Sequence, residues 1–305
     1  MHKGNIIISG GTGLIGSHLA KKMASSGHKV YILTRDPKKH KPEHSNIEFV
    51  KWELHERDEF YKEFFENAYA VVNLAGASIG KRWNDEYKKV LYDSRIDTTK
   101  KIANIILKCE TPPRVLLSAS GTGAYKDGGD DLIDEDYPIG NDFLARLCKD
   151  WEDAALKASG AGTRVIIARN GVVLDKNEGA LPQMVTPIKF FTGGWQENGK
   201  QWFPWIHIDD IINMYIWAIE SGPSGVMNAT SPNPVRNKEF CKTLAKQIHR
   251  PCLIGIPAFM LKLVLGEFAN SLLVSARVIP QKALNKGFKF KYPNLDEALK
   301  NLFAR

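Results

Sequence analysis

The chain has 305 residues, of which 43% are hydrophobic and 10% aromatic, and its formal net charge is +8. This composition fits one or two globular domains and excludes a disordered or repetitive protein. No apolar stretch approaches the roughly 20 residues needed to span a bilayer, and the N-terminus leads into an apolar run without a signal peptide. We therefore expect a cytosolic protein without a membrane partner.

The positive charge does not define a ligand, because it suits an anionic ligand, a nucleic acid or a lysine-rich surface. No basic stretch is interleaved with aromatic residues, so no nucleic-acid partner is expected. The cysteines lack any C-x-x-C pair or His-rich neighbourhood, which indicates reduced thiols and no metal site. They lie at positions 109, 148, 241 and 252.

The opening stretch organises the rest of the chain. The apolar run 5–9 breaks into Gly10-Gly11-Thr12-Gly13-Leu14-Ile15-Gly16, and residues 17–24 have a helical pattern. Backbone N–H groups and the helix dipole would point at one spot, where glycines let a pyrophosphate approach. A plain strand-to-helix turn also uses glycine, but the strand context favours dinucleotide binding. The predicted cofactor contacts here are Gly10, Thr12, Gly13, Leu14, Ile15 and Gly16.

The end of the second predicted strand, residues 27–35, bears on the choice of cofactor. An acidic residue at this place would accept hydrogen bonds from the ribose of NAD. The chain has Thr34-Arg35 instead, and a guanidinium suits the 2′-phosphate of NADP. We therefore expect NADP(H) as the cofactor, with Arg35 as a contact. Because the acidic residue Asp36 follows directly, the alternative is that Arg35 is an exposed loop residue and that the cofactor is NAD.

Two further strands end in segments suited to ligand contact. The buried run 68–76 ends in Leu74-Ala75-Gly76, small residues that let backbone pass close under a flat cofactor. The strand at 115–117 leads into a hydroxyl-rich loop that runs from Ser118 to Tyr125. Because open α/β sheets place chemistry at the carboxyl ends of their strands, Leu74, Ala75, Gly76 and Ser118 join the predicted cofactor contacts.

The remaining pattern predicts a doubly wound α/β fold with a smaller C-terminal substrate domain. Helices are expected at 83–108 and 142–159, strands at 163–169 and 225–230, and a loop-rich substrate cover at 175–204. We assign residues 1–174 and 205–232 to a dinucleotide-binding, Rossmann-like domain. Residues 175–204 and 233–305 are assigned to the substrate-binding domain.

These segments together resemble the extended short-chain dehydrogenase/reductases, the nucleoside-diphosphate-sugar epimerase group. The resemblance is narrower to an atypical epimerase-family branch with an added C-terminal segment. It covers essentially the whole chain and implies a Rossmann-like domain and NADP(H), with no established substrate. The residues that carry it are 73–79, Arg82-Trp83, 118–120, Trp151-Glu152, 169–174, 205–210, 228–230, Pro257-Ala258, Gly266-Glu267, 275–278, Gly287-Phe288 and Tyr292-Pro293.

One departure from the superfamily pattern weakens the expected chemistry. Its members use a Tyr-x-x-x-Lys pair on the helix after the Ser loop, and the alignment puts Leu144 and Cys148 at those positions. Ser120 and Tyr125 are the remaining catalytic candidates, Ser120 to hold the reacting oxygen and Tyr125 to exchange a proton. The alternative for Tyr125, which the sequence favours over proton exchange, is a tyrosine that closes the pocket wall.

Substrate contacts are predicted at Arg82, Trp202 and Trp205, although Arg82 also fits a surface arginine at a helix start. Two functions remain open. One is an NADP(H)-dependent oxidoreductase or epimerase acting on a small or nucleotide-linked substrate. The other is a catalytically weak NADP(H)-binding sensor or regulatory protein. The helices at 83–108 and 142–159 resemble a pair that forms dimers in extended members. The two alternatives are a homodimer and a monomer in which their apolar faces only cover the sheet.

Overall fold

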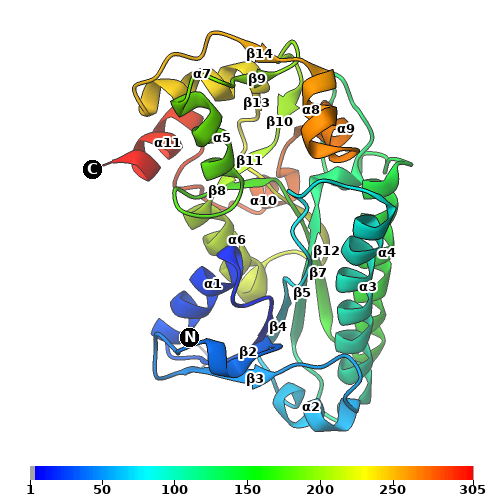
Figure 1. Ribbon diagram of the computed structural model, residues 1–305. Coiled ribbons are helices and arrows are strands. Elements are labelled where there is room, and N and C mark those ends of the chain that lie inside the picture. Colours follow the sequence, from blue (N-terminus) through cyan, green and yellow to red (C-terminus); the bar gives the residue numbers. More distant parts are fainter. Residues whose placement is uncertain (1–3, 305) are drawn as a thin grey trace.

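A seven-stranded parallel sheet forms the centre of the computed structural model, which describes residues 4–304 (Figure 1). Its strand order is β12-β7-β5-β4-β1-β2-β3. The chain winds outward in both directions from β1, so the order reverses between β1 and β4, and ligands of open α/β sheets bind at such a reversal. The strands are β1 (Asn5–Ser9), β2 (Lys29–Thr34), β3 (Ile47–Lys51), β4 (Ala70–Asn73), β5 (Val115–Gly121), β7 (Arg164–Asn170) and β12 (Gly225–Ala229).

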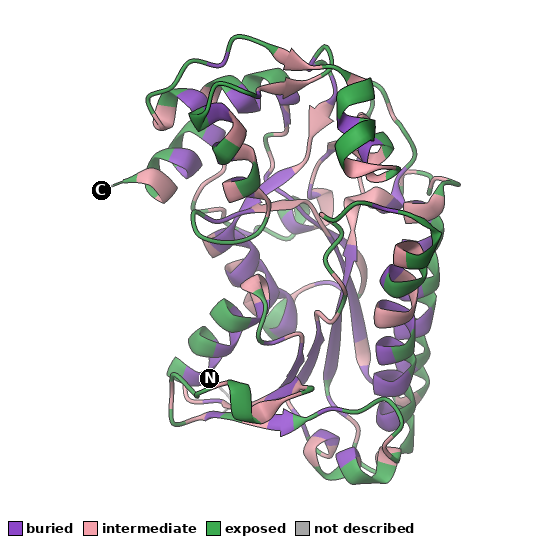
Figure 2. Cartoon of the chain, viewed as in Figure 1, coloured by how far each residue is buried: buried purple, intermediate pink, exposed green. Residues whose placement is uncertain are grey.

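Helices cover both faces of this sheet, which explains why its strands are nearly continuous apolar runs. One face packs against α1 (Leu14–Ser25), α6 (Ile208–Ser221) and α10 (Gln281–Asn285). The other packs against α2 (Asp58–Phe65), α3 (Asp85–Lys108) and η3 (Lys157–Ala161), with α4 (Phe143–Leu156) beside α3. Figure 2 shows the strands as the most buried part of the molecule. The predicted Rossmann-like fold is confirmed.

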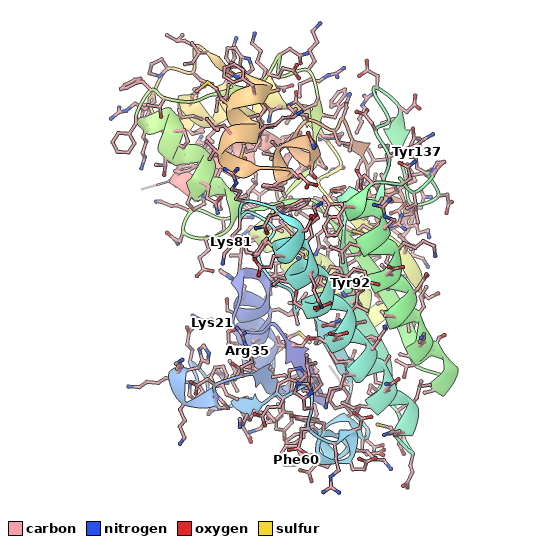
Figure 3. All side chains as sticks on the ribbon, turned by 45° about the vertical axis from the view of Figure 1, so that its right-hand side comes forward. Lys21, Arg35, Phe60, Lys81, Tyr92 and Tyr137 are labelled. Atoms are coloured by element: carbon pink, nitrogen blue, oxygen red, sulfur yellow. The ribbon has the colours of Figure 1, made fainter. Side chains whose placement is uncertain are left out.

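The long helices α3 and α4 lie side by side along one edge of the molecule (Figure 1). Both begin at a capping side chain that the sequence supplies: Asn84 accepts from the Tyr87 amide and Asp142 from the Ala145 amide. Tyr92 of α3, labelled in Figure 3, donates to Asp150 of α4 at 2.9 Å. The observed bounds lie within a few residues of the predicted 83–108 and 142–159.

A second apolar cluster lies above the sheet in Figure 1 and is built from segments far apart in the chain. It contains α5 (Ala180–Lys189), α7 (Asn237–Gln247) and α11 (Leu295–Phe303). Short strand pairs connect these segments to one another and to the sheet region. They are β8 (Val172–Leu174) with β11 (Trp205–His207), β9 (Trp195–Gln196) with β14 (Gly255–Ile256), β10 (Trp202–Phe203) with β13 (Val235–Arg236), and β6 (Leu132–Ile133) with β15 (Arg277–Val278).

Helix α5 differs from the loop expected in this region. Pro182 and Pro187 suggested irregular structure, but Pro182 stands in the first turn, where its missing N–H would have no helical partner. Pro187 lies inside the helix, which ends two residues later at Lys189. The apolar residues Leu181, Val185 and Ile188 face the C-terminal cluster at helical spacing, so burial of that stripe outweighs the proline penalty.

The C-terminal segment packs back onto the start of α3. Helices α8 (Ala258–Leu265) and α9 (Phe268–Leu272) follow β14, and the Trp83 amide donates to the Leu265 carbonyl at 3.2 Å. The rings of Trp83 and Phe268 lie 5.1 Å apart. Two short 3-10 turns, η1 (Pro37–Lys39) and η2 (Thr122–Ala124), complete the elements. Within residues 4–304, every helix is too short or too polar to cross a membrane.

Candidate functional site

Among the three glycines predicted to contact the cofactor at 10–16, namely Gly10, Gly13 and Gly16, two are required by the fold itself. Gly10 has φ +70°, and a Cβ there would lie 2.7 Å from the Leu74 carbonyl. At Gly16, inside α1, a Cβ would lie 2.6 Å from Gly11 Cα. Both positions therefore exclude larger residues because backbone crosses them closely, with or without a ligand.

Gly13 is different, because its neighbourhood is open. A Cβ at Gly13 would have one neighbour within 4 Å, the Gly10 carbonyl oxygen at an ordinary 3.5 Å, and its φ of −91° is accessible to any residue. Gly13 is the N-cap of α1, which has no side-chain cap and no acidic residue in its first turn. An uncapped helix N-terminus beside free space is suited to an anion.

The other predicted contacts of the cradle, residues 10–16, border the same space. The side chain of Thr12 is exposed, and Leu14 and Ile15 are half-buried. Leu74 and Ala75 are half-buried and Gly76 is exposed at the end of β4, the strand next to β1. The structure thus brings these two predicted segments together at the point where the strand order reverses.

Arg35 follows β2 directly and is exposed. Its neighbour Asp36 pairs with Lys39 at 3.3 Å. The acidic group that would suit an unphosphorylated ribose is therefore already partnered, whereas Arg35 has no ion pair with any residue in the described part of the chain. Figure 3 labels Arg35 and Lys81 on either side of α1 in that view.

A cover lies over the cradle. Gly179, with φ +77°, is so close to α1 that a Cβ would lie 3.0 Å from Leu14 Cδ2. Gln183 of α5 lies 3.6 Å from the corresponding position of Gly80. The segment 179–183 therefore spans from the start of α1 to the loop that follows β4.

Ser118 belongs to a buried polar network beneath the sheet edge. Ser9 donates to Asn73 at 2.6 Å, and the Asn73 amide donates to Thr99 at 2.7 Å and to Ser118 at 3.3 Å. Trp151 donates to Thr99 at 2.8 Å. Ser118 is fully buried within this network, and its predicted cofactor contact stays a prediction.

Ser120 is bonded to a buried ion pair. Its hydroxyl donates to Glu152 Oε1 at 2.6 Å, and Arg169 donates to both oxygens of Glu152 at 2.8 and 2.7 Å. Both side chains of the pair are at least 94% buried. Burial acts to lower the pKa of Arg169, but the hydrogen-bonded Glu152 carboxylate outweighs it and raises that pKa. Ser120 thus has an acceptor for its own proton.

Tyr125 is held in place by partners on other strands. It is 2% exposed, its phenol donates to Asn228 Oδ1 at 2.7 Å, and Arg169 lies 4.8 Å from its ring centre. Burial raises the pKa of Tyr125 to about 12. The phenol is therefore protonated near neutral pH, and its role as a proton carrier stays a prediction.

Helix α4 carries no replacement for the missing Tyr-x-x-x-Lys pair. Leu144 packs on Gly123, and the Cys148 thiol lies 3.8 Å from the Gly121 carbonyl. Burial raises the pKa of Cys148 to about 11, so the thiol is neutral and unreactive at pH 7.

The three predicted substrate contacts lie in different environments. Arg82 is exposed and donates to the Leu263 carbonyl at 2.5 Å. The guanidinium groups of Arg236 and Arg277 lie 4.1 and 4.5 Å from the ring centre of Trp202. Trp205 is fully buried in the C-terminal apolar cluster. These roles also stay predictions.

His207 has a structural task. Its Nδ1 accepts from the Asp209 amide at 3.0 Å and so caps α6. Asp210 accepts from the amides of Lys291 and Tyr292. The sequence His207-Ile208-Asp209-Asp210 thus orders the turn into α6 and ties it to the segment at 291–292.

Sequence reasoning missed Arg95, a buried cation in the middle of α3. Its guanidinium donates to the Leu91 and Ala77 carbonyls at 3.1 and 2.9 Å, beside Gly76. The available signal was its spacing: Leu91, Arg95 and Ile102 recur on the buried side of the helix at intervals of four and seven. Charged side chains are seldom buried, so a charge on the apolar face of a helix indicates a role other than apolar packing.

Comparisons with known proteins agree with this geometry. Residues 6–229 match the family described as the NAD dependent epimerase/dehydratase family. Residues 256–302 match a domain of unknown function, DUF1731. The first match spans the parallel sheet from the second residue of β1 to the end of β12, and the second runs from the last residue of β14 through most of α11.

Relatives of similar length occur in plants and bacteria. An epimerase family protein of Arabidopsis thaliana, the chloroplastic SDR39U1 homolog, is 39% identical over 97% of this chain and 85% of its own length. The epimerase family protein YfhF of Bacillus subtilis is 38% identical and covers 98% of each chain.

Solved structures show the same architecture. A crystal structure of the human epimerase family protein SDR39U1, isoform 2, with NADPH has a TM-score of 0.87 at 32% identity, covering 98% of this chain and 99% of that one. A nucleoside-diphosphate sugar epimerase from Corynebacterium glutamicum has a TM-score of 0.79 at 32% identity, covering 99% of this chain and 58% of that one. The predicted resemblance is confirmed, and the chain belongs to the NAD-dependent epimerase/dehydratase family.

Proposed function

We propose that this protein is an NADP(H)-dependent oxidoreductase or epimerase that acts on a small or nucleotide-linked substrate. The observation that carries the cofactor assignment is the open, uncapped N-terminus of α1 at Gly13, with the exposed Arg35 at the neighbouring strand end. A 32% identical human relative whose structure contains NADPH supports the same choice.

The residues present fit the cofactor. The N–H groups at the start of α1 would hold the pyrophosphate, and Arg35 would hold the 2′-phosphate. When bound, NADP(H) supplies a hydride donor or acceptor. Segment 179–183 would exclude water from the cradle, since it spans the space between Leu14 and Gly80.

Ser120 would hold the reacting oxygen of the substrate, and Tyr125 would exchange a proton with it. Because the Ser120 proton is directed to Glu152, its oxygen lone pairs are available to accept a hydrogen bond from a substrate hydroxyl. Tyr125 would have to exchange Asn228 for the substrate as its acceptor. With its pKa at about 12, it would act as a proton donor in carbonyl reduction across the neutral range.

The cofactor assignment is tested by titrating the protein with NADPH and NADH and following nucleotide fluorescence. We expect NADPH to bind at least about tenfold more tightly, a difference of about 1.4 kcal/mol. Equal affinity for the two nucleotides would contradict the NADP(H) assignment.

The chemical assignment is tested by turnover on a panel of carbonyl compounds and nucleotide sugars. With a substrate in hand, Tyr125→Phe should lower the rate by about 10²–10⁴-fold while NADPH affinity is unchanged. Unchanged turnover in that variant would remove Tyr125 from the proton transfer.

A second function is favoured by one specific observation. Leu144 and Cys148 occupy the two positions of α4 where the superfamily has its tyrosine and lysine, and the Tyr125 phenol already donates to Asn228. A protein that binds NADP(H) tightly and turns over no member of the panel would fit the sensor or regulatory function instead.

A further inference from the structure

The C-terminal part of the molecule carries an apolar surface that faces outward. The large apolar side chains with the highest exposed fractions, 61–79%, all lie in the segments 190–191 and 253–264. Elsewhere within residues 4–304 the most exposed of them, Phe60, is at 55%. Single exposed apolar residues are normal, whereas a gathered set marks a surface that binds something. We define the apolar face as Phe190, Phe191, Leu253, Ile254, Phe259, Met260, Leu263 and Val264.

The fold places the two segments beside each other. Residues 190–191 stand in the turn between α5 and β9, and β9 pairs with β14, which residues 253–254 precede. A Cβ at Gly193 would lie 3.4 Å from Ile256 Cδ1, so the turn after α5 contacts β14 directly. Figure 2 shows the loop before β14 and most of α8 as exposed at the top of the molecule.

Helix α8 continues this surface. Its four members of the apolar face form two pairs spaced by four residues, so they lie on one side of the helix. Within α8 the one buried residue is Leu261. The end of the helix is bonded to the loop after β4, where the Trp83 amide donates to the Leu265 carbonyl. Packing within the chain therefore does not account for the apolar character of α8.

The backbone at Phe191 supports a binding role for the turn after α5. Its φ of +59° is in the left-handed region, which bulky residues seldom adopt, so the conformation is strained. Burial does not offset this strain, because the residue is 61% exposed. Strained residues cluster where proteins bind other molecules.

Cations accompany the apolar face in these parts of the chain. Residues 179–194 and 248–266 contain no aspartate or glutamate, and their charged residues Lys189, Arg250 and Lys262 are exposed. The next acids along the chain are Glu178, Glu197 and Glu267, and the last of these is already paired with Lys88 at 2.6 Å. The face therefore suits a partner that is apolar inside and anionic at its surface.

A second copy of the chain fits this face less well than a lipid surface does. A symmetric contact would bring Lys189, Arg250 and Lys262 toward the same cations of the other copy, and like charges at an interface weaken binding. An anionic bilayer offers hydrocarbon to the apolar side chains and phosphates to the cations. Lysine and arginine suit that boundary, because their long stems stay in apolar surroundings while their charged ends reach the headgroups.

We propose that the apolar face binds the surface of an anionic lipid bilayer. Its aromatic and aliphatic side chains enter the boundary between headgroups and acyl chains, and the three cations contact lipid phosphates. The expectation of no membrane partner rests on the lack of a spanning segment, which attachment from one side does not need. The inference goes beyond the proposed function and does not depend on it.

The test measures flotation of the full-length chain with two kinds of vesicle, pure phosphatidylcholine and phosphatidylcholine with an equal share of phosphatidylglycerol. The double variant Phe259→Gln with Leu263→Gln removes two outward apolar side chains from α8. Its matched control is Phe60→Gln with Leu132→Gln, which removes an exposed phenylalanine and an exposed leucine from other parts of the molecule.

A second pair of variants tests the charge. Lys262→Glu reverses a cation beside the apolar face, and Lys100→Glu reverses an exposed cation of α3 as its control. Thermal melting of every variant reports whether it folds, and light scattering without vesicles reports its oligomeric state.

We expect wild type to bind the phosphatidylglycerol vesicles at least about tenfold more tightly than the pure phosphatidylcholine vesicles, and high salt to reduce this difference. The double α8 variant and Lys262→Glu should each weaken binding to the anionic vesicles by about tenfold or more. Both controls should bind like wild type. The altered side chains are exposed, so melting temperatures should stay close to wild type, and Leu263→Gln alone provides the same comparison if the double variant does not fold.

Several results would overturn the inference. They are an absence of binding to the anionic vesicles, equal binding to both kinds of vesicle, or equal losses in the α8 variants and their controls. A wild-type dimer that becomes monomeric in the double variant, without vesicle binding, would make the apolar face a contact between copies. A monomeric wild type that binds no vesicles would leave an acidic protein as the occupant instead of a bilayer.

Discussion

The two ends of the candidate site are built by opposite means. The cradle consists of backbone and glycines, and its N–H groups at the start of α1 lack side-chain caps. At the end of β5, hydroxyl, amide and carboxylate groups are bonded to one another, as in Ser120 with Glu152 and Tyr125 with Asn228. The first region is completed by a ligand, whereas the second is largely complete without one.

This difference indicates that ligand binding and fold stability can be changed separately. Where polar groups are free to bind a ligand, a substitution can weaken ligand binding without lowering the stability of the fold. Where polar groups are hydrogen-bonded to one another, a substitution also lowers the free energy of unfolding. Cofactor binding and fold stability should therefore respond to different residues, and substitutions can break or sharpen this contrast.

The largest effect is expected at the buried pair. Arg169→Gln leaves the Glu152 carboxylate buried with a neutral partner, and we expect the free energy of unfolding in urea to fall by about 3–5 kcal/mol. The exposed pair of Arg236 with Asp130 provides a matched control. Arg236→Gln should change it by less than about 1 kcal/mol, and equal losses in both variants would contradict the contrast.

A large and selective effect is expected at Gly13. Gly13→Val meets free space in the protein and should leave the melting temperature within a few degrees of wild type. The added side chain would occupy the anion position, so NADPH affinity should fall by at least about 100-fold, or 2.7 kcal/mol. Gly16→Val, which collides with backbone, should not fold. Retained NADPH binding by a folded Gly13→Val protein would place the nucleotide elsewhere.

A smaller effect is expected at Arg35. Arg35→Ala removes one charged contact to the 2′-phosphate, which is worth about 1.5–3 kcal/mol. Fluorescence titration should show weaker NADPH binding and unchanged NADH binding. Lys38→Ala, an exposed cation in the following turn, serves as the control. A parallel loss for both nucleotides would remove Arg35 from the ribose end.

The smallest effect concerns pH and His207. Burial lowers the pKa of His207 in the folded state, so its neutral form contributes stability above about pH 6.5, its ordinary pKa, and this contribution is lost as the pH falls below that value. His207→Asn keeps a capping side chain but cannot titrate. The stability advantage of wild type over this variant should shrink between pH 7.5 and 5.5, and a constant difference would refute the assignment.

The fold and the cradle could be predicted because their signals are local. A glycine at position 10 predicts the positive φ of the turn after β1, and continuous apolar runs predict strands that are buried on both faces. The bonding of Tyr125 could not be predicted, since its partner Asn228 is 103 residues away and on another strand. Arg95 was missed because a helix pattern does not report which backbone carbonyls a buried guanidinium reaches. Helix α5 was not predicted because prolines are typical of loops. Only the structure shows that Pro182 stands in the first helical turn, where a proline is tolerated.

The network of Ser9, Asn73, Thr99 and Trp151 has a consequence for how the chain folds. Its hydrogen bonds join residues that are 64, 26 and 52 positions apart, on β1, β4, α3 and α4. A nascent chain that ends before Trp151 lacks the fourth member, so Thr99 is left without one donor in a dry interior. We therefore expect β1, β4, α3 and α4 to become protected together only once α4 is present, and their amides to exchange with deuterium at a common slow rate.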